Sequence, residues 1–180
     1  MSMTLEFCVD WDAALWADTP DFTGTYDDIS SYVMSYAVVR GQKTELGNTP
    51  AGTMELVLNN SSGIFSAVNT AGDLYGLIRP WLPVRFRAVV GVTTYPVYTG
   101  FLSRLTCYAH RTRQTAVMYC TDGMDLLARN MVVQNENDRT EATDGAAIEA
   151  LLNAAGWSAS KRSIDTSGGN ITKYPVTVEY

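Results

Sequence analysis

The chain has 180 residues, 46% of them apolar and 18% charged, which is enough for one large domain or two small ones with a hydrophobic core. No apolar run approaches the roughly 20 residues that span a bilayer, and the first residues lack a signal peptide's basic opening, so we expect synthesis in the cytoplasm. A net charge of −6 argues against a protein that grips nucleic-acid phosphates.

Alternating apolar and polar residues predict strands along most of the first 121 residues. These strands are expected at Met3–Val9, Tyr32–Arg40, Gly52–Leu58, Val84–Val90, Tyr95–Leu105 and Gln114–Thr121. The pattern is clearest where Met54, Leu56 and Leu58 share one face of a strand. The segment from Asn59 to Pro80 is longer than most connections, which favours a binding or packing loop.

Two helices are predicted after these strands. The first begins near Asp122, whose side chain is a suitable cap, and extends through Leu127. The second covers Asp144–Ala155 and ends at Gly156, a residue that commonly terminates helices. Its expected packing face consists of Ile148, Leu151, Leu152 and Ala155.

The last ten residues, Ile171–Tyr180, are strand-like, and an unpaired terminal strand is a site for pairing with another chain. Most expected elements are thus strands, with helices in the last third. We predict a mainly β fold, a β-barrel or sandwich, over residues 1–130. A small α/β extension is expected over residues 131–180, and one interpretation is that it begins a further domain.

The residue types needed for catalysis are sparse. His110 is the only histidine and lies in a basic turn, so we interpret it as a surface residue. The pairs Asp27–Asp28 and Asp10–Asp12 could bind a cation or form an acid–base couple, but they are more typical of an acidic surface loop. We expect no catalytic residue, no cofactor and no metal site.

The three cysteines, Cys8, Cys107 and Cys120, lie far apart in strand-like segments and are expected to be buried free thiols. Trp81 lies between prolines, a rigid context that suits an aromatic anchor, while the other tryptophans fit either a core or a sugar-binding platform.

Charge is segregated along the chain. Seven acidic residues and no basic one precede Arg40, whereas the segment from Arg79 to Arg113 holds six arginines and no acid. Two interpretations remain open: solvated faces, or an acidic and a basic surface that meet between subunits. The candidate interface residues are Arg79, Arg85, Arg87, Arg104, Arg111, Arg113 and Trp81.

Motifs from Val33 to Thr166 resemble, in order, a pattern of tail proteins from tailed bacteriophages. The pattern has an Arg-Gly strand end, an Ala-Gly-Thr strand with a Leu-x-Asn ending, a Gly-x-Phe/Tyr-Ser loop, a Pro-Val-Arg strand, a Phe-x-Gly-hydrophobic strand and an Asp-x-x-x-x-Leu close. A helix and an Ile-Asp-Thr tail follow. The matching segments are Arg40–Gly41, Pro50–Asn60, Gly63–Ser66, Leu82–Phe86, Tyr98–Leu102, Cys120–Leu127, Ala147–Trp157 and Arg162–Thr166. The chain is therefore similar to the amino-terminal part of tail-hub proteins.

This resemblance implies a non-enzymatic structural subunit of a phage tail tip or baseplate hub, built on a barrel of the tail-tube type. Such hubs form a ring of three copies with pseudo-sixfold symmetry that joins the tail tube to fibre or spike proteins. The resemblance places the protein in the virion tail, where DNA passes without specific binding and no membrane is contacted. The alternatives are another tail ring component (a distal-tail or tube-completion protein), a carbohydrate-binding β-sandwich adhesin, or a small hydrolase that uses the acidic pairs.

Overall fold

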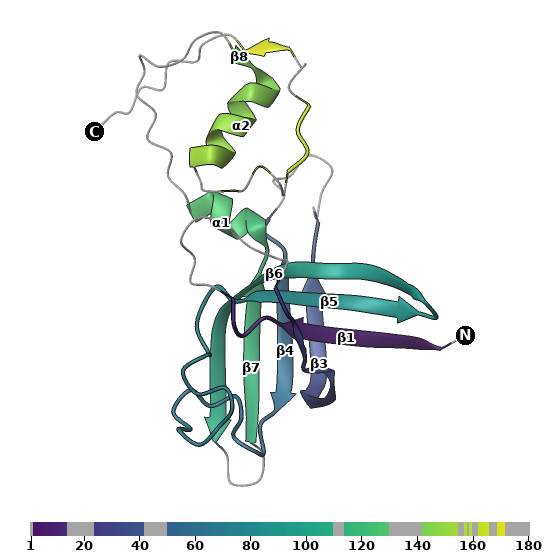
Figure 1. The fold of residues 1–180 in the computed structure, drawn as a ribbon, viewed down its shortest axis with the longest axis vertical. Helices are drawn as coiled ribbons and strands as arrows, with labels where there is room; N and C mark the ends of the chain where they lie inside the picture. The colour runs from purple at the N-terminus through teal and green to yellow at the C-terminus, as the bar shows by residue number, and fades with distance from the viewer. Residues whose placement is uncertain are drawn as a thin grey trace. The chain divides into compact units, whose positions relative to one another are not determined.

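Figure 1 shows the fold in a computed structural model. The structure describes residues 2–13, 24–41, 50–109, 114–129 and 142–154, together with 157, 159, 162–165 and 169–171. The chain forms two compact units, one holding the described residues up to Leu126 and the other those from Leu127 onward. Each unit is described by itself.

The first unit is built on a curled antiparallel sheet whose described strands follow the order β2-β1-β5-β6-β7-β4-β3. The strands are β1 (Met3–Val9), β2 (Asp27–Asp28), β3 (Val33–Val39), β4 (Thr53–Asn59), β5 (Pro83–Val90), β6 (Thr93–Ala109) and β7 (Gln114–Thr121). A short 3-10 helix, η1 (Ser30–Tyr32), connects β2 to β3. The prediction of a mainly β fold is confirmed, and the sheet is a half-barrel (Figure 1).

The strands form where the sequence alternates, because one face of each strand supplies the core. In β4, Met54, Leu56 and Leu58 are buried, as predicted, while Glu55 is exposed. The same alternation continues around the sheet. Other core members are Phe7, Val9, Trp11, Val84, Phe86, Tyr98, Leu102, Ala116 and Met118.

The long connection between β4 and β5 is a chain of tight turns. Backbone N–H groups donate to carbonyl oxygens three residues earlier at every third position, with distances of 2.9–3.1 Å. The donors are Gly63, Ser66, Asn69, Gly72 and Tyr75. Phe65 and Leu74 are buried in the core, so this segment is a packing loop.

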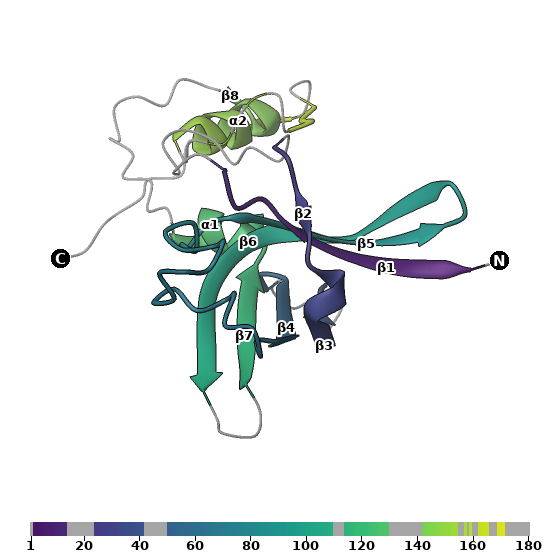
Figure 2. The same cartoon turned by 60° about the horizontal axis from the view of Figure 1, so that its bottom comes forward.

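A three-stranded arm leaves the body of the half-barrel. Figures 1 and 2 both show the first half of β1, the end of β5 and the start of β6 running together beyond the other strands. Gly91 and Val92 join β5 to β6, and Gly91 has a φ of 63°, which suits a two-residue hairpin turn. Val92 is fully exposed at the tip of this arm.

The division between the two units falls within helix α1 (Gly123–Arg129), and helix α2 (Asp144–Ala154) belongs to the second unit. Helix α1 follows β7, and α2 is preceded by β8 (Ala142–Thr143), which pairs with β9 (Asn170–Ile171). No helix in the described part of the chain is long and apolar enough to cross a bilayer.

One prediction about α2 is wrong: Ile148, expected on the packing face, is 48% exposed. Apolar residues lie on several sides of this helix, so the sequence does not specify which side packs. In the structure Arg162 lies over α2 and donates hydrogen bonds to the Glu149 carbonyl at 3.1 Å and to the Asn153 side chain. The strand expected at Ile171–Tyr180 lies outside the described residues, apart from Ile171 in β9.

Candidate functional site

One of the described candidate interface arginines, Arg87, forms an ion pair within the chain. In the β1–β5 register Glu6 lies opposite Arg87, and Nε of Arg87 lies 2.7 Å from Oε2 of Glu6. This pair joins the acidic start of the sequence to its basic central stretch. The segregation of charge along the chain is therefore compensated here inside the fold, which lowers the amount of free positive charge on β5.

Other arginines of the set contact aromatic rings or backbone. The guanidinium of Arg85 lies 3.3 Å from the centre of the Tyr26 ring, and that of Arg104 lies 4.3 Å from the centre of the Tyr119 ring. Both are cation–π contacts, which hold a guanidinium against a surface. Arg79 donates a hydrogen bond to the Ala13 carbonyl oxygen.

The described arginines of the set lie on different elements of the first unit. Arg85 and Arg87, two positions apart in β5, share one face of that strand, whereas Arg79 lies before it and Arg104 on β6. Arg111, Arg113 and His110 lie outside the described residues. Arg104 and Tyr119 also line a groove of about 430 Å³ on the sheet surface, to which the exposed Glu55 contributes.

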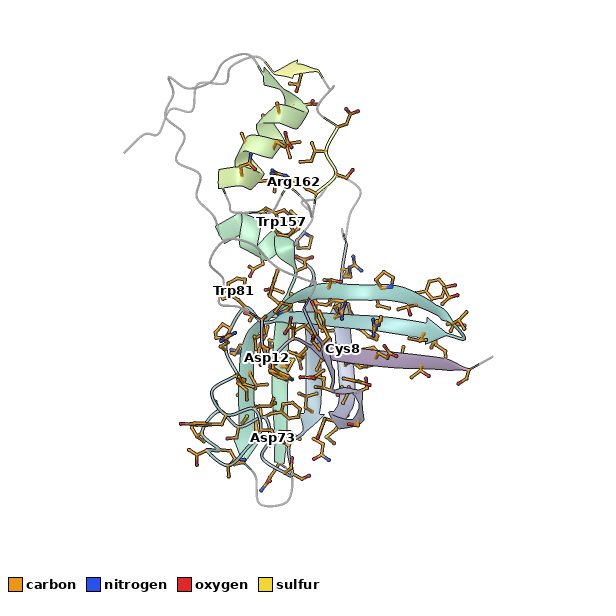
Figure 3. The ribbon with its side chains drawn as sticks, viewed as in Figure 1. Cys8, Asp12, Asp73, Trp81, Trp157 and Arg162 are labelled. Atoms are coloured by element: carbon orange, nitrogen blue, oxygen red, sulfur yellow. The ribbon has the colours of Figure 1, made fainter. Side chains whose placement is uncertain are left out.

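Trp81 has a backbone conformation that the sequence did not predict. Its φ is 69°, a left-handed value that costs a non-glycine residue roughly 1–2 kcal/mol. Its N–H donates to the Leu102 carbonyl at 2.7 Å, and its half-buried ring lies 6.1 Å from the Phe101 ring. Figure 3 shows Trp81 in the connection that leads into β5. The strain is held by the hydrogen bond and by the packing around the ring.

The carboxylate pairs do not converge as an acid–base couple would. Asp27 and Asp28 are neighbours in a strand and so point to opposite faces of the sheet. Asp28 accepts hydrogen bonds from the N–H and the hydroxyl group of Ser30. Asp10 is buried, whereas Asp12 is exposed. Within the described ranges no three histidine, cysteine or acidic side chains gather as metal ligands.

The cysteines are free, and two of them are buried as predicted, namely Cys8 and Cys120. Cys107 is exposed at the residue level, so the prediction of burial is wrong there; its thiol still lies 3.1 Å from the Phe65 carbonyl oxygen. Burial raises the pKa of all three thiols. They are therefore protonated at neutral pH and poor nucleophiles.

The feature that sequence reasoning missed is the seam where the half-barrel stays open. A groove of about 420 Å³ separates β1 from β3, which are not hydrogen-bonded to each other. It is lined by Leu5, Phe7, Ser30, Val33, Met34, Ser35 and Tyr36. The Tyr36 ring lies 5.2 Å from both the Phe7 and the Phe86 rings, so aromatic contacts connect the two sides. The sequence feature that could have indicated this seam is the lack of charged residues in β3.

At the seam, β1 and β3 each have backbone N–H and C=O groups that are not paired with another described strand. Phe7 donates its N–H to the Ser30 hydroxyl and accepts from the Ile29 N–H, so its polar backbone groups point to the seam. The backbone N–H and C=O groups of every second residue in a strand point to the same edge. The backbone groups of Met3 and Leu5 therefore point to the seam as well. The short strand β2 covers β1 only at Cys8 and Val9. In the described sheet, β3 pairs with β4 alone.

Comparison of the sequence with models of known protein families and with curated proteins finds no match.

Proposed function

We propose that this protein is a structural, ring-forming subunit of a phage tail tip or baseplate hub, which joins the tail tube to distal fibre or spike proteins. The observation that carries the proposal is the open antiparallel half-barrel, whose described strands leave a free edge on both sides of the seam. The motifs between Val33 and Thr166 resemble those of tail-hub proteins and occur in the same order, which supports the same role.

Free strand edges favour an oligomer over a monomer. An unpaired strand edge is a template for pairing, and monomeric β proteins usually close, cover or charge their edges. Here β3 has seven residues, none of them charged, and Met34, Tyr36 and Val39 are each about half exposed. A subunit that is completed by its neighbours accounts for such an edge.

The charge of the chain suits a wall around DNA. A net charge of −6 repels phosphates, so the genome would pass along an acidic conduit without adhering to it. A structural role also agrees with protonated thiols and with carboxylates that do not converge. We therefore propose no enzymatic activity for this chain.

The same geometry suits another tail ring component, such as a distal-tail or tube-completion protein. A sugar-binding adhesin receives less support, because Trp11 is 2% exposed and packs 6.4 Å from the Phe65 ring within the core.

The proposal is tested by locating the protein in particles of the phage that encodes it. Gold-conjugated antibodies raised against the purified chain should label one end of the tail in negatively stained virions. Pre-immune antibodies and antibodies against the major capsid protein serve as controls. Virions that carry no label at the tail end, although they react with the capsid antibody, would overturn the proposal.

A further inference from the structure

We propose that the free edge of β1 in one copy of this chain pairs with the free edge of β3 in the next copy, joining subunits head to tail. The inference rests on the proposed ring-forming function and names the two surfaces that meet. The binding partner is a second copy, because one chain carries both edges.

Neither edge has the protection found at the other free edge of the arm. The other free edge of the arm, the first half of β6, contains Pro96, which has no N–H to donate. Arg40 also covers that edge by donating a hydrogen bond to the Val97 carbonyl oxygen. By contrast, β1 before Cys8 and the whole of β3 contain neither proline nor lysine.

Apolar side chains accompany both edges. On the arm, the register places Met3 beside Val90 and Leu5 beside Ala88, on the sheet face that continues into the core through Phe7. Met3 is 63% exposed, and on β3 Met34 is 51% exposed. Pairing the two edges would bury these side chains together with the backbone hydrogen-bonding groups, and both contributions favour association.

Charge favours a second copy at these strands. Each copy carries a net charge of −6, so association through acidic surfaces is opposed by repulsion. Strand β3 has no charged residue, and the single charge of β1, on Glu6, is neutralised by Arg87 of the same chain. The two edges can therefore approach each other without bringing like charges together.

Pairing of two different edges is heterologous, and heterologous contacts close into rings or continue as filaments. Pairing of β3 with a second β3 would instead give a closed two-fold dimer. The two arrangements differ in their dependence on β1, which makes them separable by mutation.

The test uses three variants of the full chain, each with a new lysine at an exposed apolar position. Met3→Lys blocks the β1 edge and Met34→Lys blocks the β3 edge, whereas Val68→Lys, at a loop residue that is 86% exposed, is the matched control. Mass photometry and sedimentation velocity measure the size of each variant, and circular dichroism verifies its fold.

We expect wild type and Val68→Lys to form rings or longer head-to-tail oligomers, and each edge variant alone to remain monomeric. An equimolar mixture of the two edge variants should stop at two copies, since it contains one intact β1–β3 contact. Oligomers that persist in both edge variants, or a wild type that stays monomeric at its highest soluble concentration, would overturn the inference.

A wild-type dimer that is lost in Met34→Lys and kept in Met3→Lys would show β3–β3 pairing and also refute the inference. Gold labelling of virions is independent of these results. Labelled tails combined with intact oligomers in both edge variants would therefore refute the proposed contact and leave the proposed function standing.

Discussion

Asp122 joins the start of β4 to the start of α1, and its removal should destabilise the first unit. One carboxylate oxygen accepts the Gly52 N–H at 2.7 Å, and the other accepts the Met124 N–H at 3.0 Å. A hydrogen bond to an ionised group contributes about 1.5–3 kcal/mol and a helix cap about 1 kcal/mol. We expect Asp122→Ala to lower the free energy of unfolding by roughly 2–4 kcal/mol, and Asp122→Asn, which retains a cap, by about half as much.

Urea unfolding followed by circular dichroism measures this difference, and a thermal melt should show a fall in Tm of about 2–4 °C for each kcal/mol lost. Asp73→Ala is the control, because it removes a carboxylate from an exposed loop position (Figure 3). If Asp122→Ala and Asp73→Ala differ by less than about 0.5 kcal/mol, the carboxylate does not hold these elements together.

Three further predictions concern single positions. A Cβ at Gly24 would overlap Oδ2 of the buried Asp10, so Gly24→Ala should lower the free energy of unfolding by about 1–3 kcal/mol in urea titrations; an unchanged midpoint would contradict this geometry. Because burial raises the pKa of Cys120 above its ordinary value of 9.0, the folded state keeps a proton that the unfolded state loses, and stability should fall with rising pH above about 9. The slope should be shallower in Cys120→Ala by up to about 1.4 kcal/mol per pH unit, and equal slopes would show that this thiol is not involved. Finally, Trp81→Gly should be more stable than Trp81→Ala by about 1 kcal/mol, since glycine adopts a φ of 69° without strain; the reverse order in urea would refute the strained backbone.

The individual strands could be predicted because their local pattern follows from which face is buried. The alternation of Met54, Leu56 and Leu58 defines the inner face of β4 without knowledge of its neighbours. The strand Met3–Val9 was predicted with the bounds that the structure gives.

What the sequence could not specify is which strands become neighbours. Glu6 and Arg87 are separated by 81 positions, so their ion pair depends on the β1–β5 register and not on local pattern. The seam is equally non-local, because it arises where η1 leads the chain away from β1 after two paired residues. The left-handed backbone at Trp81 depends on its bond to Leu102, which adjacent prolines do not reveal.

The partner of β1 has a consequence for the order of folding during synthesis. Strand β1 leaves the ribosome before the other described strands, yet its partner β5 begins at Pro83. At the usual rate of elongation, about 80 further residues take on the order of 4–16 s, during which Leu5, Phe7 and Val9 have no sheet to join. The consecutive strands β5, β6 and β7 pair with short separations and should form early, so β1 is added to a sheet that already exists. Strand β1 is thus made before its sheet and is among the last of the described strands to be placed.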